Sequence, residues 1–160
     1  MRPAKSPQLA NLSCFEGNWE TKAETKILCL GQNFDVRGTT DNAWEGDGWY
    51  LVERGSYEMG ELGTVHEIGV WTWDEKAKRY RTWRFDTFGG TRFGTATFDE
   101  ATRTWTLKAT RRSAWGDSND RGTIKVVDDR TLEWKWEEWS TWDPLRLFKM
   151  AEFSGTSTKK

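Results

Sequence analysis

From residue 17 onward, one pattern repeats along the chain: short runs rich in Thr, Trp, Phe, Tyr and Val alternate with clusters of Gly, Asp and Asn. Inside the runs polar and apolar residues alternate, which is the two-residue period of a β-strand with one buried face. The runs predict strands near residues 18–28, 32–38, 48–55, 63–73, 79–87, 91–98, 103–110, 121–127, 131–140 and 145–154. The chain is therefore expected to be all-β.

The segments between the predicted strands are short and polar. Residues 74–78, 88–90 and 99–102 have the lengths and compositions of hairpin turns. Hairpins join antiparallel neighbours, and such a sheet loses its exposed edges when it closes on itself. We therefore expect an antiparallel up-and-down β-barrel of eight to ten strands. A two-sheet sandwich is the alternative, although its usual long crossover connections are missing from the pattern.

The N-terminal segment follows a different period. Leu9, Leu12 and Phe15 recur at intervals of three, behind Ser6 and Pro7, which favour the first positions of a helix. We expect a short helix over about 6–15, a barrel over about 17–154 and a frayed tail over 155–160. A length of 160 residues fits a single domain spanning 1–160. Twelve Trp, eight Phe and three Tyr can build its core, because each ring buries about 150–250 Å².

Charge and hydropathy argue against several classes of protein. The net charge of -1 disfavours a nucleic-acid-binding protein, which usually carries a basic excess. No apolar run approaches the roughly 18–20 residues of a membrane helix, and the N-terminus lacks the apolar region of a signal peptide. We therefore expect a cytoplasmic protein without a membrane partner. Cys14, Cys29 and the single His66 have no metal-ligand spacing, so no metal is expected.

Alternation predicts which side chains face the interior. On the strand 103–110, Trp105 belongs to the apolar, inward face. On the strand 79–87, Trp83 and Phe85 share one face and Arg84 and Asp86 the other. We expect the two rings inside and the two charged groups on the surface. A charged pair inside a wide barrel is the alternative.

Two further strands carry candidate site residues. On the strand 131–140, Trp134, Trp136 and Glu138 share a face, which would combine an apolar slot with one polar anchor. On the strand 63–73 the direction of His66 stays open, because a bulge at Gly69 would invert one half of the strand relative to the other. His66 is of interest because it is the only residue with an unperturbed pKa near neutrality.

Short motifs connect the chain with a known family. Residues 16–20 (EGNWE), directly after the predicted helix, resemble the Gly-x-Trp opening of lipocalins and related calycin barrels. Residues 68–74 (IGVWTWD), 80–83 (YRTW) and 86–89 (DTFG) are similar to a bacterial lipocalin-like family known only as a domain of unknown function. The resemblance covers about residues 8–154. It implies a calycin-type barrel with a ligand cavity, and it implies no activity.

The resemblance also bears on Trp19 and on haem. It implies that Trp19 plugs one end of the barrel, with a cation of the last strand, Arg146 or Lys149, over its ring. Haem-binding calycins continue Gly-x-Trp-x-Gly-x-Gly, whereas Trp19 is followed here by Glu, Thr, Lys and Ala. We therefore expect neither haem nor another cofactor.

Two functions remain after these exclusions. The favoured one is binding of a small, largely apolar and planar molecule in a Trp-rich cavity of the barrel. The alternative is a cofactor-independent enzyme of the isomerase, cyclase or lyase type, with His66 or Glu138 as its acid or base. No nucleophile elbow, P-loop or dinucleotide fingerprint points to another chemistry. The expected ligand contacts are His66, Trp83, Phe85, Trp105, Trp134, Trp136, Glu138 and Phe148.

Overall fold

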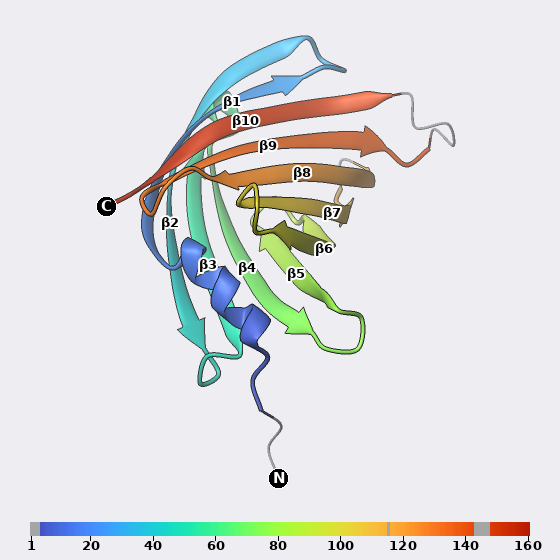
Figure 1. Cartoon of the computed structure of the whole chain (residues 1–160). Coiled ribbons are helices and arrows are strands. Elements are labelled where there is room, and N and C mark those ends of the chain that lie inside the picture. The colour runs from blue at the N-terminus through green and yellow to red at the C-terminus, as the bar shows by residue number, and fades with distance from the viewer. Residues whose placement is uncertain (1–3, 115, 143–147) are drawn as a thin grey trace.

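The structure, a computed structural model, describes residues 4–114, 116–142 and 148–160, which form a closed barrel of ten strands (Figure 1). The elements in chain order are η1 (Pro7–Phe15), β1 (Gly17–Ile27), β2 (Gln32–Glu45), β3 (Tyr50–Glu58), η2 (Gly60–Leu62), β4 (Thr64–Asp74), β5 (Arg79–Asp86), β6 (Thr91–Asp99), β7 (Thr104–Arg112), β8 (Ser118–Val126), β9 (Thr131–Ser140) and β10 (Lys149–Lys159).

Each strand pairs in antiparallel fashion with its neighbours in the chain, and β1 pairs with β10 to close the sheet. The expected all-β, up-and-down barrel is therefore confirmed. Within the described part of the chain, no helix is long and apolar enough to cross a membrane.

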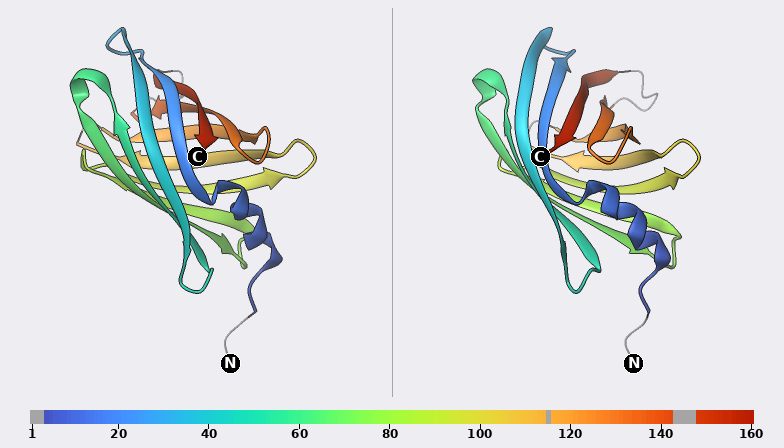
Figure 2. Two further views of the ribbon diagram at one scale, coloured as in Figure 1. Left: turned by 90° about the vertical axis from the view of Figure 1, so that its left-hand side faces the viewer. Right: turned by 60° about the vertical axis from the view of Figure 1, so that its left-hand side comes forward.

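The N-terminal helix is a 3₁₀ helix that lies against the end of the barrel where β1 begins (Figure 2). Its three residues per turn explain the spacing of Leu9, Leu12 and Phe15, which all lie on its buried face. Tyr80 fastens the helix to β5 by donating its hydroxyl proton to the Gln8 carbonyl at 2.8 Å. The helix thus closes one end of the barrel with apolar side chains.

The C-terminal residues 155–160 do not fray, so this expectation was wrong. β10 continues to Lys159 and pairs with β1 from Ala151, opposite Ile27, to Lys159, opposite Trp19 (Figure 1). The polar, Gly-containing sequence suggested a tail because the closing partner strand, β1, lies more than a hundred residues away in the chain. The predicted start of the same strand, 145–147, lies outside the described residues.

β2 is also longer than expected, because Gly38 lies inside the strand and does not end it. A Cβ at Gly38 would lie 2.3 Å from Cδ1 of Tyr57, the residue opposite on β3. The missing side chain makes room for the Tyr57 ring. Gly122 on β8 does the same for Trp136 on β9, where a Cβ would lie 2.0 Å from Cε3 of the indole.

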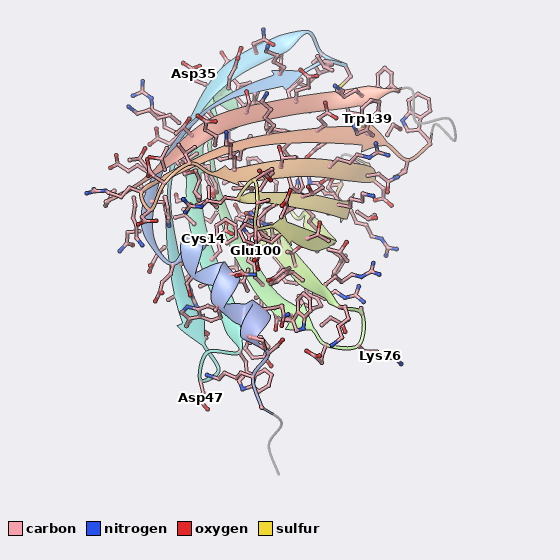
Figure 3. All side chains as sticks on the ribbon, in the orientation of Figure 1. Cys14, Asp35, Asp47, Lys76, Glu100 and Trp139 are labelled. Carbon is pink, nitrogen blue, oxygen red and sulfur yellow. The ribbon has the colours of Figure 1, made fainter. Side chains whose placement is uncertain are left out.

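Side chains alternate between the two faces of each strand, so one set points into the barrel and the other points out to solvent (Figure 3). Next to η1, the interior is closed by five rings packed against one another, which we call the aromatic floor: Phe15, Trp71, Tyr80, Phe98 and Trp105. Trp105 is fully buried, with ring centroids 4.7 Å from both Tyr80 and Phe98.

Trp19 is buried in this same half of the barrel, as predicted, and its Nε1 donates to the Phe15 carbonyl at 2.8 Å. The cation over its ring is Lys159, with Nζ 5.7 Å from the centroid. Of the two predicted cations, Lys149 lies instead over the ring of Trp139, and Arg146 lies outside the described residues.

Candidate ligand site inside the barrel

The face of β5 that points into the barrel is the opposite of the one predicted. Arg84 and Asp86 point into the barrel, whereas Trp83 and Phe85 point outward, and Phe85 is 49% exposed. Placing the two rings inside was therefore wrong. The pairing of Thr82 with the buried Trp71 fixes the phase of the strand, because directly opposed residues share a face of the sheet.

His66 lies on the outside of the barrel, where it is exposed. The pairing of β4 with β3 runs without a register shift through Gly69, so the strand keeps one phase along its length. Val65, Glu67 and Trp71 consequently face inward and His66 outward. An interior contact of His66, catalytic or otherwise, is ruled out in this arrangement.

The predicted face of β9 is correct. Trp134, Trp136 and Glu138 all point into the barrel, and Glu138 is 7% exposed. Trp105 also points inward, but it forms part of the closed floor. Phe148 is 40% exposed and packs against Trp142, with ring centroids 5.6 Å apart, so its expected place among the interior rings was wrong.

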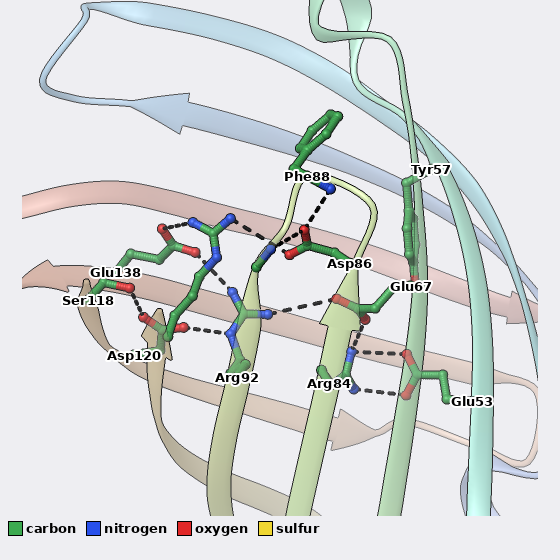
Figure 4. A network of polar contacts seen from close by, with 12 residues as sticks. Glu53, Tyr57, Glu67, Arg84, Asp86, Phe88, Arg92, Ser118, Asp120 and Glu138 are labelled. Atoms are coloured by element: carbon green, nitrogen blue, oxygen red, sulfur yellow. Dashed lines mark hydrogen bonds and ion pairs between the residues drawn. The ribbon is translucent and has the colours of Figure 1, made fainter. Parts of the chain in front are cut away.

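Beyond the aromatic floor, the interior carries eight charged side chains, three arginines and five carboxylates, which we call the interior ion cluster (Figure 4). They come from seven consecutive strands, β3 to β9, and meet in the half of the barrel remote from η1. The members are Glu53, Glu67, Arg84, Asp86, Arg92, Arg111, Asp120 and Glu138.

Arg84 is the most completely satisfied of the three arginines. Its guanidinium donates two hydrogen bonds to Glu53, at 2.8 and 3.0 Å, and a third to Glu67 at 2.6 Å (Figure 4). The paired geometry with Glu53 matches the flat fork of the guanidinium to the carboxylate. Trp71 adds a bond from Nε1 to Glu53 at 3.4 Å, which ties the cluster to the aromatic floor.

Arg92 joins the two sides of the cluster. Its Nε donates to Asp120 at 2.6 Å and its Nη2 to Glu138 at 3.0 Å, while Nη1 lies 3.9 Å from Glu67. The guanidinium also lies over Trp136, 5.1 Å from the ring centroid. A cation held between carboxylates and an indole face gains from both contacts.

Arg111 is held more loosely. Its nearest carboxylate oxygens are those of Glu138 at 3.7 Å and Asp86 at 3.8 Å, which are ion pairs too long to be hydrogen bonds. Among the described residues, no acceptor takes a hydrogen bond from its side chain. Arg111 therefore has donor capacity left for a group that enters the barrel.

Burial raises the pKa of two carboxyl groups in the cluster. Desolvation raises the pKa of Glu53, with Glu67 adding repulsion and Arg84 opposing both. Desolvation likewise raises the pKa of Glu138, assisted by Asp120 and opposed by Arg92 and Arg111. Five carboxylates facing three guanidiniums leave a formal charge of -2 when all are ionised, and this excess favours the protonated forms of Glu53 and Glu138.

Apolar side chains line the other side of this half of the barrel. The inward positions on β9, β10, β1 and β2 include Trp134, Trp136, Phe153 and Phe34, which we call the aromatic wall. Each of these side chains is only half-buried although it points inward. The three arginines of the cluster likewise keep 18–19% of their side-chain surface accessible. The wall and the cluster therefore each keep surface that is accessible to solvent.

Seven members of the cluster were not among the expected ligand contacts: Glu53, Glu67, Arg84, Asp86, Arg92, Arg111 and Asp120. The alternation contained a signal for some of them. The face of β7 that begins at Trp105 ends at Arg111, just as the face of β9 that begins at Trp134 passes through Glu138. An inward face that turns charged at the same end of several strands indicates a polar interior.

The described residues contain no group of three or more His, Cys, Asp or Glu side chains arranged to hold a metal ion.

Comparisons with known proteins establish the fold alone. No protein-family model matches the chain, and no curated protein matches it significantly. Among solved structures, Rv2717c from M. tuberculosis superposes with a TM-score of 0.73 at 12% identity, covering 98% of this chain and 99% of its own. The S-type phycobiliprotein lyase CPES from Guillardia theta gives 0.62 at 10% identity, over 93% and 90%. A DUF3598 family protein from Nostoc punctiforme gives 0.49 at 10% identity, over 98% of this chain and 51% of its own. The first two superpositions show that the chain shares the fold of Rv2717c and of the phycobiliprotein lyase.

Proposed function

We propose that the protein binds a small, planar, largely apolar molecule inside the barrel, between the aromatic wall and the interior ion cluster. The observation that carries the proposal is the contrast between these two linings. Half-buried rings face accessible guanidiniums across the half of the barrel that η1 leaves open. Ligand sites commonly combine an apolar lining with a few polar groups in this way.

The geometry favours a ligand with at least one polar edge. A planar molecule stacked on Trp136 or Phe153 would direct its edge toward Glu138 and Arg111, since Glu138 lies opposite Ala151 on the strand pair that carries both rings. Arg111 offers unused donors, and Glu138 offers a carboxylate with a raised pKa. Such an edge gains hydrogen bonds that a purely hydrocarbon ligand would leave unmade.

Intrinsic fluorescence tests the proposal. Titration with a panel of planar compounds bearing one hydroxyl, amide or carboxyl group is expected to quench indole emission saturably, with Kd in the micromolar range. Trp136→Ala should weaken the tightest ligand at least tenfold, and Arg111→Gln should weaken it severalfold. Trp139→Ala removes an indole from the outer face of the same strand and is the matched control. Saturable binding unchanged in Trp136→Ala, or no binding by any compound, would refute the proposal.

An enzyme remains the second candidate, now with Glu138 alone as its acid or base. The observation in its favour is that two carboxylates, Glu138 and Asp86, flank one loosely held cation, Arg111. A buried carboxylate with a raised pKa suits general acid–base catalysis near neutral pH. The phycobiliprotein lyase is by name an enzyme, which is an analogy of fold only. Conversion of a bound compound that stops in Glu138→Gln while binding persists would establish this function.

A further inference from the structure

The outer face of β5 to β8 carries two parallel rows of side chains that the interior site does not use. Register places Trp83 beside Phe93, followed by Thr110 and Asn119 on the next strands. Two residues away along each strand, a second row places Arg81, Thr95, Lys108 and Arg121 side by side. We call these the aromatic row and the basic row.

A groove of about 330 Å³ lies between the two rows, with the backbone of Thr82, Gly94, Ala109 and Asp120 as its base. It crosses four strands, so its length is roughly 14 Å, and the rows stand roughly 7 Å apart. Phe93 is 44% exposed, and Phe85, next to Trp83 on the outer face of β5, is 49% exposed. Large rings left in water on a sheet face mark a surface that binds something.

The charge of this face differs from that of the whole chain. Outward positions on β5 to β8 hold six cations, Arg79, Arg81, Lys108, Arg112, Arg121 and Lys125, and one carboxylate, Asp99. Arg81 is partly neutralised by Asp74 at 3.0 Å. Neither Lys108 nor Arg121 has a side-chain ion pair with any described residue. Arg121 lies opposite Glu137 on β9, a carboxylate that Lys149 already holds at 2.7 Å, so the charge of Lys108 is fully available to an anionic partner and that of Arg121 in part.

We propose that this groove binds single-stranded nucleic acid, with bases stacked on Trp83 and Phe93 and backbone phosphates at Lys108 and Arg121. Stacking platforms beside a basic track are the means by which proteins bind single strands without sequence preference. An acidic peptide would use the basic row but leave two ring faces unmatched. A duplex hides the faces of its bases, and a single nucleotide fills only one ring and one cation.

The experiment is a polarisation titration with a fluorescein-labelled dT12 strand over a range of salt concentrations. We expect a Kd of about 10⁻⁴–10⁻⁶ M near physiological salt, and a slope of log K against log salt of about -1.4, the value for two phosphates neutralised on a single strand. Trp83→Ala and Phe93→Ala should each weaken binding about fivefold or more while leaving that slope unchanged.

Charge variants complete the test, because both cations are exposed and their replacement leaves the interior intact. Lys108→Gln should reduce the slope by about 0.7, and Lys108→Glu with Arg121→Glu should abolish binding. Lys22→Gln, an exposed cation on the outer face of β1, is the matched control and should change neither affinity nor slope. A folded Trp83→Ala variant that binds dT12 like the parent would overturn the proposal. Equal competition by polyglutamate of the same charge would also overturn it, as would a Kd above about 1 mM at 50 mM salt.

Discussion

Arg92 illustrates how single buried charges determine the chemistry of this barrel. Its guanidinium touches Asp120, Glu138 and Glu67 and lies over Trp136. Desolvation would lower its pKa, but the surrounding carboxylates more than compensate and hold the pKa above its usual value. Removing one member of a buried ion pair costs far more than the pair contributes, because it leaves the other charge uncompensated.

Arg92→Met is therefore expected to lower the free energy of unfolding by about 3–5 kcal/mol at pH 7. The loss should be smaller at pH 5, because the carboxylates left without a cation have higher pKa values in the folded than in the unfolded state and take up protons. Urea unfolding at the two pH values measures both effects. Lys125→Met, at an exposed position of β8, should cost less than about 0.5 kcal/mol at either pH. A loss that does not depend on pH would contradict this explanation.

Glu138→Gln should behave in the opposite way. The folded-state pKa of Glu138 is raised, so its contribution to stability is greatest below the ordinary value of 4.5 and declines as the pH rises through the folded pKa. The variant does not titrate at this position. Relative to the parent, it should gain stability as the pH rises above 4.5, until the pH passes the folded-state pKa of Glu138. Unfolding curves at half-unit intervals test this, and a difference that is constant across the range would show that Glu138 keeps an ordinary pKa.

For single residues, the alternation of polar and apolar positions predicted correctly which side chains share a face of a strand. It was less successful in predicting which of the two faces points into the barrel. Trp134, Trp136 and Glu138 were placed correctly because the rings of β9 do point inward. The same preference for buried rings failed on β5, where Arg84 and Asp86 are inside and Trp83 and Phe85 outside. Hydrophobicity alone could not reveal this, because the carboxylates that compensate Arg84 come from β3 and β4.

Among the elements, β10 has the largest effect on closure. It pairs with β1 over nine residues and places Lys159 over the Trp19 ring. Ser157 also shares a hydrogen bond of 2.7 Å with Thr21 on the inward face of β1. Without this strand, β1 and β9 would become open edges, which expose unpaired backbone groups to other chains.

Removal of residues 155–160 should therefore destabilise the protein by more than about 4 kcal/mol, the range seen only for disruption of a core or a buried network. The shortened chain is also expected to aggregate through its new edges. Thermal unfolding and light scattering measure the two effects. Thr156→Ala with Thr158→Ala keeps the strand and changes only exposed side chains, so it should remain within about 1 kcal/mol of the parent. A monomeric shortened chain of parental stability would show that closure does not depend on β10.

Strand existence was predictable from period and turn residues, whereas strand ends were not. Two of the errors occur where Gly38 and Gly155 suggested breaks. Both glycines lie inside paired strands, and each faces a neighbour that occupies the space of its missing side chain: Tyr57 beside Gly38 and Ala23 beside Gly155. The residues around such a glycine in the sequence do not reveal which side chain of the partner strand will occupy the space beside it.

On the scale of the whole molecule, the net charge of -1 conceals an uneven distribution. The interior ion cluster has an excess of carboxylates, and the outer face of β5 to β8 has an excess of cations. The same strands carry both, because successive side chains point to opposite sides. The overall charge therefore argues against a basic protein, but it describes neither the charge of the interior nor the charge of this outer face. The fold was predictable because a period of two and short turns permit few other topologies.

Closure also predicts how the molecule unfolds. Each strand from β3 to β9 contributes side chains both to the apolar core and to the interior ion cluster, and every strand of the barrel has two hydrogen-bonded neighbours. Neither half can lose its packing while the other keeps its strands, so unfolding should be a single cooperative transition. Urea curves recorded by indole emission and by far-UV circular dichroism should have midpoints that agree within error. The same agreement is expected for Trp19→Ala, which should shift both midpoints together through a loss of roughly 3–5 kcal/mol. An indole transition that precedes the loss of strands would instead show that the charged half opens on its own.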